Sequence, residues 1–178
     1  MSARCVFYPL GNADSTLIVL NDNRHLLIDY AHYAEGSGDK RCDLPSKLDA
    51  ELKKSGRQSF AAVCFTHLDD DHVHGAEDYF YLEWANKYQG ADRPGIDELW
   101  VPAAAITETG SEDSAYAIRQ EARHRLRKGK GIRVFSRPEA LRDWLEGEDL
   151  TLEDRKHCIV DAGQVVPTFS KGGQERFE

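Results

Sequence analysis

The segment that most constrains this chain is 66–75, reading THLDDDHVHG, which directly follows the apolar run 60–65. Three His and three Asp fall within eight of its positions. So many polar, ligand-capable side chains at the mouth of a buried strand are costly unless something binds them. His67 and Asp69 are two residues apart, so in an extended segment their side chains point the same way. Asp71 and His72 follow where the chain can turn into a helix. The spacing predicts four ligands around one pocket: His67, Asp69, Asp71 and His72.

Imidazole and carboxylate together indicate which ions such a pocket would take. Both suit divalent ions from zinc through manganese and iron, and a run that holds both can bridge two ions. We therefore expect two divalent metal ions, zinc or manganese, with magnesium or iron as alternatives. The competing interpretation is a strand-to-helix loop in which Asp caps the helix and the His are incidental. Capping needs only one short polar side chain, which leaves the other five unexplained.

The same segment resembles the signature of the metallo-β-lactamase superfamily of metal-dependent hydrolases, written HxHxDH after a strand ending in Thr or Ser. Here it reads HxDxDH, with Asp69 in place of the second His. The resemblance implies that His67 and Asp69 hold one metal. It also implies that Asp71 and His72 hold the other, with Asp71 as the catalytic residue that helps to orient the nucleophile. A carboxylate at position 69 makes the first site harder, which shifts its preference from zinc toward manganese or magnesium.

A second match lies near the N-terminus, where GNADSTLIVL at 11–20 precedes HLLIDY at 25–30. It resembles the opening hairpin of the branch related to the nuclease-like domain of the DNA-uptake protein ComEC. The resemblance implies that Asp29 lies beneath the metal centre and orients the metal-binding loop without ligating, and that Asp14 supports it. For Asp14 and Ser15 the alternative is an ordinary turn.

Length and patterning predict one domain, 1–178, because 178 residues with 40% hydrophobic content can bury a substantial core. Short apolar runs between turn residues predict an antiparallel meander at 5–10, 15–20 and 26–30. Leu44, Leu48 and Leu52 recur every four residues and predict an amphipathic helix with Ser46 as N-cap and Gly56 as its stop. Further strands are expected at 60–65, 99–101 and 132–135, and helices at 76–88, 112–128 and 138–145. This order fits an α/β (α+β) fold, an αββα metallo-β-lactamase sandwich.

The resemblance also implies that only the N-terminal half of that sandwich is present, with inserted helices. A second half of the family fold normally supplies a His or Asp that bridges the metals, often in a Gly-Asp dipeptide, and a final His. The only Gly-Asp dipeptide here, Gly38-Asp39, precedes the metal loop, and His124 and His157 are the only His after it. We therefore expect a C-terminal half, in the same polypeptide or in a separate chain, as a partner.

Two His and one basic run are further candidates for binding substrate. His74 and His32 are expected to line the substrate pocket, although His74 could equally face solvent on the first turn of a helix. The basic run 119–133 would track a phosphate backbone, unless it is simply the wet face of a helix. Its candidate nucleic-acid contacts are Arg119, Arg123, Arg127 and Lys130.

Charge and cysteine usage narrow the class of protein. A formal charge of −8 argues against a surface that coats nucleic acid generally, but allows a local basic groove. The four Cys never come closer than 22 residues, which is typical of reduced thiols. No apolar run approaches the roughly 18 residues of a membrane helix, and no leader opens the chain. These features predict a cytoplasmic protein without a membrane partner.

These patterns predict a metal-dependent hydrolase, a phosphodiesterase or nuclease in which a metal-activated hydroxide attacks phosphorus in a nucleic acid or nucleotide. One alternative is a diiron redox enzyme of the same superfamily, because its flavodiiron branch also carries an acidic residue at the second ligand position. The other is a non-catalytic scaffold or sensor subunit of a multi-protein assembly.

Overall fold

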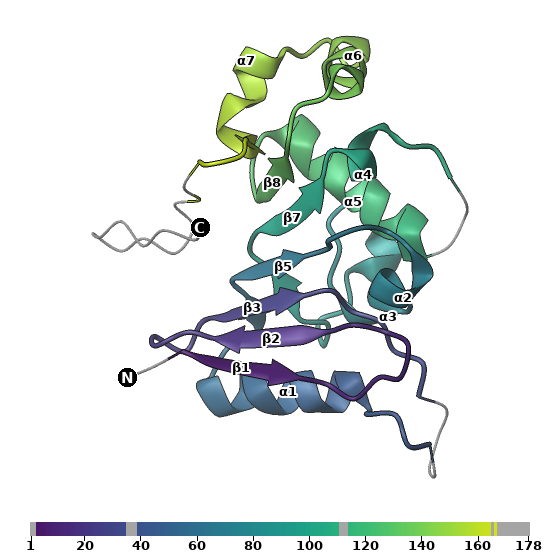
Figure 1. Ribbon diagram of the computed structural model, residues 1–178, viewed down its shortest axis with the longest axis vertical. Helices are drawn as coiled ribbons and strands as arrows, with labels where there is room; N and C mark the ends of the chain where they lie inside the picture. Colours follow the sequence, from purple (N-terminus) through teal and green to yellow (C-terminus); the bar gives the residue numbers. More distant parts are fainter. Residues whose placement is uncertain (1–2, 35–38, 111–113, 165, 167–178) are drawn as a thin grey trace.

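The computed structural model describes residues 3–34, 39–110, 114–164 and 166. Seven of its strands form one mixed sheet, which Figure 1 shows stacked from β1 at the bottom toward β8 near the top. In spatial order they are β1 (Arg4–Phe7), β2 (Thr16–Val19), β3 (His25–Ile28), β5 (Ala62–Cys64), β7 (Leu99–Pro102), β8 (Ile132–Phe135) and β9 (Ile159–Val160). Two short strands, β4 (Ser59–Phe60) and β6 (Gly95–Ile96), form a separate parallel pair.

The opening meander is confirmed, and the strands after it run parallel. β1 pairs with β2 and β2 with β3 in antiparallel register, with Leu17 opposite Leu27. From β3 onward, β5, β7, β8 and β9 each lie parallel to the strand before them in the sheet. The carboxyl ends of β3, β5 and β7 therefore meet at one edge of the sheet, where parallel α/β sheets place their ligand sites.

The helices and 3₁₀ turns of the described chain are α1 (Leu44–Ser55), α2 (Asp70–Val73), α3 (Ala76–Tyr79), η1 (Asn86–Tyr88), α4 (Ala104–Thr107), α5 (Ser114–Lys128), α6 (Glu139–Gly147), α7 (Leu152–Arg155) and η2 (Lys156–Cys158). Figure 1 shows α1 beside the β1 end of the sheet, and α6 with α7 at the opposite end.

The amphipathic helix predicted from three leucines is confirmed as α1, whose Leu44, Leu48 and Leu52 are buried. Gly56 ends it in the left-handed conformation, as predicted. The prediction of Ser46 as N-cap is wrong. Asp43 holds that position and accepts a hydrogen bond from the Ser46 amide at 3.3 Å, because Asp43 stands immediately before the first helical residue.

A long helix at 76–88 is also wrong. α3 ends at Tyr79, and Phe80 is extended at φ −83° and ψ 149°. Phe80 then makes edge contacts with Tyr30, Phe60 and Phe65 in the core. Burying adjacent aromatic rings in this way overrides local helix propensity. The predicted strand 60–65 is also divided, since Phe60 belongs to β4 and Ala62–Cys64 form β5.

The remaining predicted elements agree with the structure. Strands occur at 99–102 and 132–135, and α6 follows Pro138, which occupies its N-cap position. α5 corresponds to the helix expected at 112–128, although Glu112 itself lies outside the described residues. A mixed α/β class is thus confirmed. No helix in the described ranges combines the length and apolar character that crossing a membrane requires.

The two faces of the sheet differ in what covers them. On one face Leu17, Leu27 and Val63 pack with buried residues of α1 and α5 in the main core. The strand residues between them point to the other face and form a second cluster that includes Leu26, Ala62, Trp100 and half-buried Phe135. Among the residues described, that second cluster contains none from a helix.

A buried ion pair ties α5 to its surroundings. Glu121 is 0% exposed and accepts hydrogen bonds from Arg125 Nε at 2.6 Å and from the Trp84 amide at 3.0 Å. Arg125 in turn donates to the carbonyls of Ile96 and Gly131, both at 2.9 Å. Each charge is therefore paired, and further hydrogen bonds connect the pair to β6 and to the turn before β8.

Replacing Glu121 by Ala is expected to lower the free energy of unfolding by about 3–5 kcal/mol, since the Arg125 charge stays buried without its partner. The matched control is Glu148→Ala, which removes the partner of Arg127 from a half-exposed ion pair and should cost about 1 kcal/mol or less. Urea denaturation followed by circular dichroism measures both. Equal losses of unfolding free energy in the two variants would show that the buried ion pair stabilises the fold no more than the half-exposed one.

Candidate metal centre

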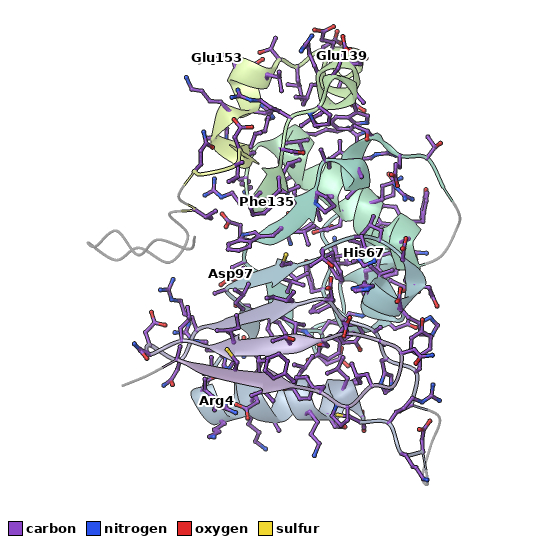
Figure 2. All side chains as sticks on the ribbon, viewed as in Figure 1. Arg4, His67, Asp97, Phe135, Glu139 and Glu153 are labelled. Carbon is purple, nitrogen blue, oxygen red and sulfur yellow. The ribbon has the colours of Figure 1, made fainter. Side chains whose placement is uncertain are left out.

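Three of the predicted ligands come together at the carboxyl edge of the sheet. The ligand atoms of His67, Asp71 and His72 all lie within 4.8 Å of one another, so this group could hold a metal ion. The two imidazole rings are 3.7 Å apart between centroids, and His72 Nε2 is 3.6 Å from Asp71 Oδ2. His67 follows β5, whereas Asp71 and His72 lie in α2; Figure 2 labels His67 beside that helix. A strand-to-helix turn thus folds the motif back on itself.

The Asp29 carboxylate lies beneath this group and contacts the loop at several points. It is 4% exposed and follows β3, with φ +56°, a left-handed conformation that Asp tolerates better than most residues. Its Oδ1 accepts from the Thr66 amide and its Oδ2 from the Thr66 hydroxyl, both at 2.7 Å. Its Oδ2 is also 2.9 Å from His72 Nδ1, within ion-pair distance although not aligned as a hydrogen bond.

These contacts define the orientation of His67. An ionised carboxylate only accepts hydrogen bonds, so the single Thr66 hydroxyl proton points to Asp29. His67 Nδ1 lies 3.1 Å from the same hydroxyl oxygen and must therefore donate to it. The proton of the neutral His67 ring is then on Nδ1, which leaves the Nε2 lone pair available for a ligand.

His72 is oriented by the same carboxylate. Its Nδ1 faces Asp29 and its Nε2 faces Asp71. A carboxylate beside Nδ1 favours the tautomer that carries its proton there, as in carboxylate–His–metal arrangements. Both imidazoles thus present Nε2 toward the same space, which fits a metal better than a set of incidental loop residues.

Backbone hydrogen bonds hold the loop against the segments that follow β3 and precede β2. The Tyr30 amide donates to the His72 carbonyl and the His32 amide to the His74 carbonyl, both at 3.0 Å. The Asp14 amide donates to the Asp71 carbonyl at 3.3 Å. Asp14 is near the site through its backbone, while the residue itself is exposed.

Asp69, the fourth predicted ligand, lies outside the three-residue group. Its side chain is 77% exposed, and its Oδ2 is 3.5 Å from His67 Nε2. It precedes α2 at the N-cap position without a side-chain capping bond. The carboxylate is therefore close enough to approach an ion at His67, but no described contact holds it there.

His74 belongs to a neighbouring cluster that the sequence reasoning missed. Its Nδ1 is 3.0 Å from Asp70 Oδ1, its ring stacks on Tyr33 with centroids 4.1 Å apart, and the Tyr33 hydroxyl donates to Asp70. The Tyr33 hydroxyl and His74 together lower the pKa of Asp70. The i,i+4 spacing of Asp70 and His74 on a short helix was the available signal.

The other predicted pocket residue, His32, contributes its backbone amide to this side of the loop. Its ring is half-buried, and its Nδ1 has no hydrogen-bond partner among the described residues. It is not a member of the three-residue metal group.

The predicted basic run does not form one open stripe. Arg123 donates to the Ile106 and Glu108 carbonyls, both at 2.8 Å, and Arg127 pairs with Glu148. Lys130 is exposed, but Arg119 is buried. The helix thus turns these four cations toward different surroundings.

A cavity of about 390 Å³ opens beside His67. His67, Leu68 and Asp69 form one side of it, and residues of α4, the segment after α4, and α5 form the other, with Arg119 among them. No protein-family model matches the chain, and no curated protein matches it.

Asp29→Asn is expected to weaken zinc or manganese binding about 10–100-fold, the usual effect of losing such a supporting carboxylate. An amide group facing His72 Nδ1 donates a hydrogen bond, so the ring proton moves to Nε2 and blocks the ligand atom. Asn also tolerates the left-handed backbone at this position, so the fold should survive.

Isothermal titration with each metal measures the change, with circular dichroism as the folding control. Asp43→Asn removes one carboxylate charge at the α1 N-cap, away from the metal group, and should bind metal normally. Unchanged metal affinity in Asp29→Asn would show that the Asp29 carboxylate does not determine the tautomer of His72.

Proposed function

We propose that this protein is a metal-dependent hydrolase that cleaves phosphodiesters, with a nucleic acid or a nucleotide as substrate. The observation that carries the proposal is the convergence of His67, Asp71 and His72, with both imidazoles oriented from below by Asp29. The HxDxDH segment and the N-terminal stretch that resemble the ComEC-related branch of the metallo-β-lactamase superfamily support the same chemistry.

Two imidazoles and one carboxylate suit zinc and manganese, and three protein ligands leave coordination positions open for water and substrate. A divalent ion held there by His67, Asp71 and His72 would lower the pKa of a bound water and neutralise charge on a phosphoryl group. Asp71 is half-exposed at the rim, where its free oxygen can accept the proton of the attacking water. The exposed Asp69 carboxylate, 3.5 Å from His67 Nε2, would contribute to a second ion.

The test compares two adjacent carboxylates of α2. Asp71→Ala should lose metal and reduce phosphodiesterase activity at least about 100-fold, because it removes one of three ligands. Asp70→Ala removes the same charge one residue earlier, where the side chain contacts Tyr33 and His74. It should retain metal.

Metal content is measured by elemental analysis and activity with bis(p-nitrophenyl) phosphate in added manganese or zinc. A wild-type chain that binds metal and leaves phosphodiesters intact would remove the hydrolase proposal. Equal metal content in the two variants would remove Asp71 from the ligand set.

We further propose that the second face of the sheet packs against the other β-sheet of an αββα sandwich, supplied by a C-terminal half in the same polypeptide or a separate chain. The second cluster leaves Ile18, Ile28, Cys64 and Phe135 only partly buried, and Phe7 on the edge strand is 77% exposed. Such a half would also bring further ligands to a site that has three.

The 178-residue chain alone should therefore bind a hydrophobic dye such as ANS, since contiguous exposed apolar surface is what the dye detects. Ile28→Lys, a charge introduced on this face at a half-buried position, should reduce the dye signal. Fluorescence titration together with size-exclusion chromatography makes the measurement. A monomer without dye binding contradicts the proposal, and a dimer without it assigns the face to a second copy of the chain.

A further inference from the structure

Arg119 is a buried cation that the residues around it leave unpaired. It lies on α5 and is 6% exposed. Its Nε and Nη1 atoms are inaccessible to solvent and have no hydrogen-bond partner, and no ion pair to it occurs in the described ranges. An arginine cannot lose its charge in a protein, so this charge remains in a poorly solvated place.

An unpaired buried charge destabilises a fold, so the presence of one at Arg119 requires another explanation. Removing a charge from water costs several kcal/mol unless a partner compensates for it. Arg123, one turn further along α5, already directs its donors to the Ile106 and Glu108 carbonyls. Burial and the neighbouring Arg119 and Arg127 charges lower the pKa of Arg123. The local field is thus positive, and no residue that the structure describes offers Arg119 an acceptor.

The cavity beside His67 reaches the Arg119 side chain, whose Nε and Nη1 are themselves shielded from water. Arg119 lines that cavity together with His67 and Asp69, so one continuous space joins it to the candidate metal centre. Gly110 lies against the guanidinium, because a Cβ there would be 3.4 Å from Nη1. Glu108 also lines the space.

We infer that this cavity is an anion subsite in which Arg119 binds a phosphoryl group of the substrate, while the bond to be hydrolysed lies at His67, Asp71 and His72. The guanidinium fork matches phosphate oxygens and can donate two parallel hydrogen bonds. The inference rests on the proposed hydrolase function for the reaction, and on the cavity and its unpaired arginine for the site. Arg119 is thereby a substrate-binding residue, and the substrate carries a phosphoryl anion.

The experiment uses inorganic phosphate on the full chain stripped of metal with EDTA, at pH 8, where free imidazoles are neutral. The wild type should bind phosphate at millimolar concentration, and Arg119→Met should bind it at least about tenfold more weakly, since the loss of a charge-assisted pair is worth a factor of that order. Arg127→Met removes an exposed charge from the same helix and should bind phosphate like the wild type. Titration calorimetry measures all three.

Thermal melting distinguishes a role of Arg119 in binding phosphate from a role in stabilising the fold. Met fills the aliphatic space of Arg119 without an unpaired charge, so Arg119→Met should melt at the same temperature as the wild type or higher. With metal restored, Arg119→Met should raise KM for a dinucleotide that carries a 5′-phosphate, which offers Arg119 a phosphoryl group beside the bond that is hydrolysed, and should bind the metal as tightly as before. Arg119→Lys, which keeps the charge without the fork, should fall between the wild type and Arg119→Met.

The outcomes distinguish this inference from the proposed function. Phosphate binding that is absent, or equal in the wild type and Arg119→Met, overturns the subsite even if the metal-loaded chain hydrolyses phosphodiesters. Acetate binding as tight as phosphate overturns the phosphoryl assignment. Phosphate binding that depends on Arg119, in a chain that neither binds metal nor hydrolyses, supports the subsite and contradicts the hydrolase.

Discussion

The site depends on one buried carboxylate. Asp29 accepts both Thr66 hydrogen bonds, and the direction of the Thr66 hydroxyl proton then decides which nitrogen of His67 is free. The same carboxylate faces His72 Nδ1. A single negative charge below the loop therefore turns two imidazoles so that both present Nε2 to one space. Without it each ring could adopt either tautomer, and a metal would have to select the productive pair at a cost in affinity.

The backbone around Asp29 explains how the carboxylate reaches that place. β3 ends at Ile28, and the next residue adopts φ +56°, where its amide donates to the Cys64 carbonyl at 2.7 Å. That turn departs from the regular strand and aims the side chain across to the end of β5. The parallel pairing of β3 with β5 is what brings the two strand ends together. Asp at this position thus serves the backbone and the site at once, because it is among the few residues that tolerate the conformation.

Much of this arrangement could be predicted from local sequence, and its failures have a common physical cause. The meander and α1 follow from turn residues and from leucines four apart, and the grouping of His67, Asp71 and His72 follows from their spacing after an apolar run. The helix expected at 76–88 fails because Phe80 is drawn into the core against Phe60 and Phe65, which are distant in sequence. For the basic run, local pattern left open a stripe that tracks a phosphate backbone or the wet face of a helix, and it could not show that Arg119 and Arg125 pack inward.

Two buried arginines on α5 show why burial must be weighed together with partners. Arg125 meets Glu121 and two carbonyls, so its charge and its donors are compensated, and its role is to join α5 to β6 and the turn before β8. Arg119 lies on the same helix and is buried to a similar degree, but in the described part of the chain it has no acceptor. Both arginines are buried, but only the Arg125 charge has partners. A role in stabilising the fold therefore explains Arg125 and does not explain Arg119. The paired arginine stabilises the fold, whereas the unpaired one retains its capacity for an anion, and it does so in the cavity that opens at His67.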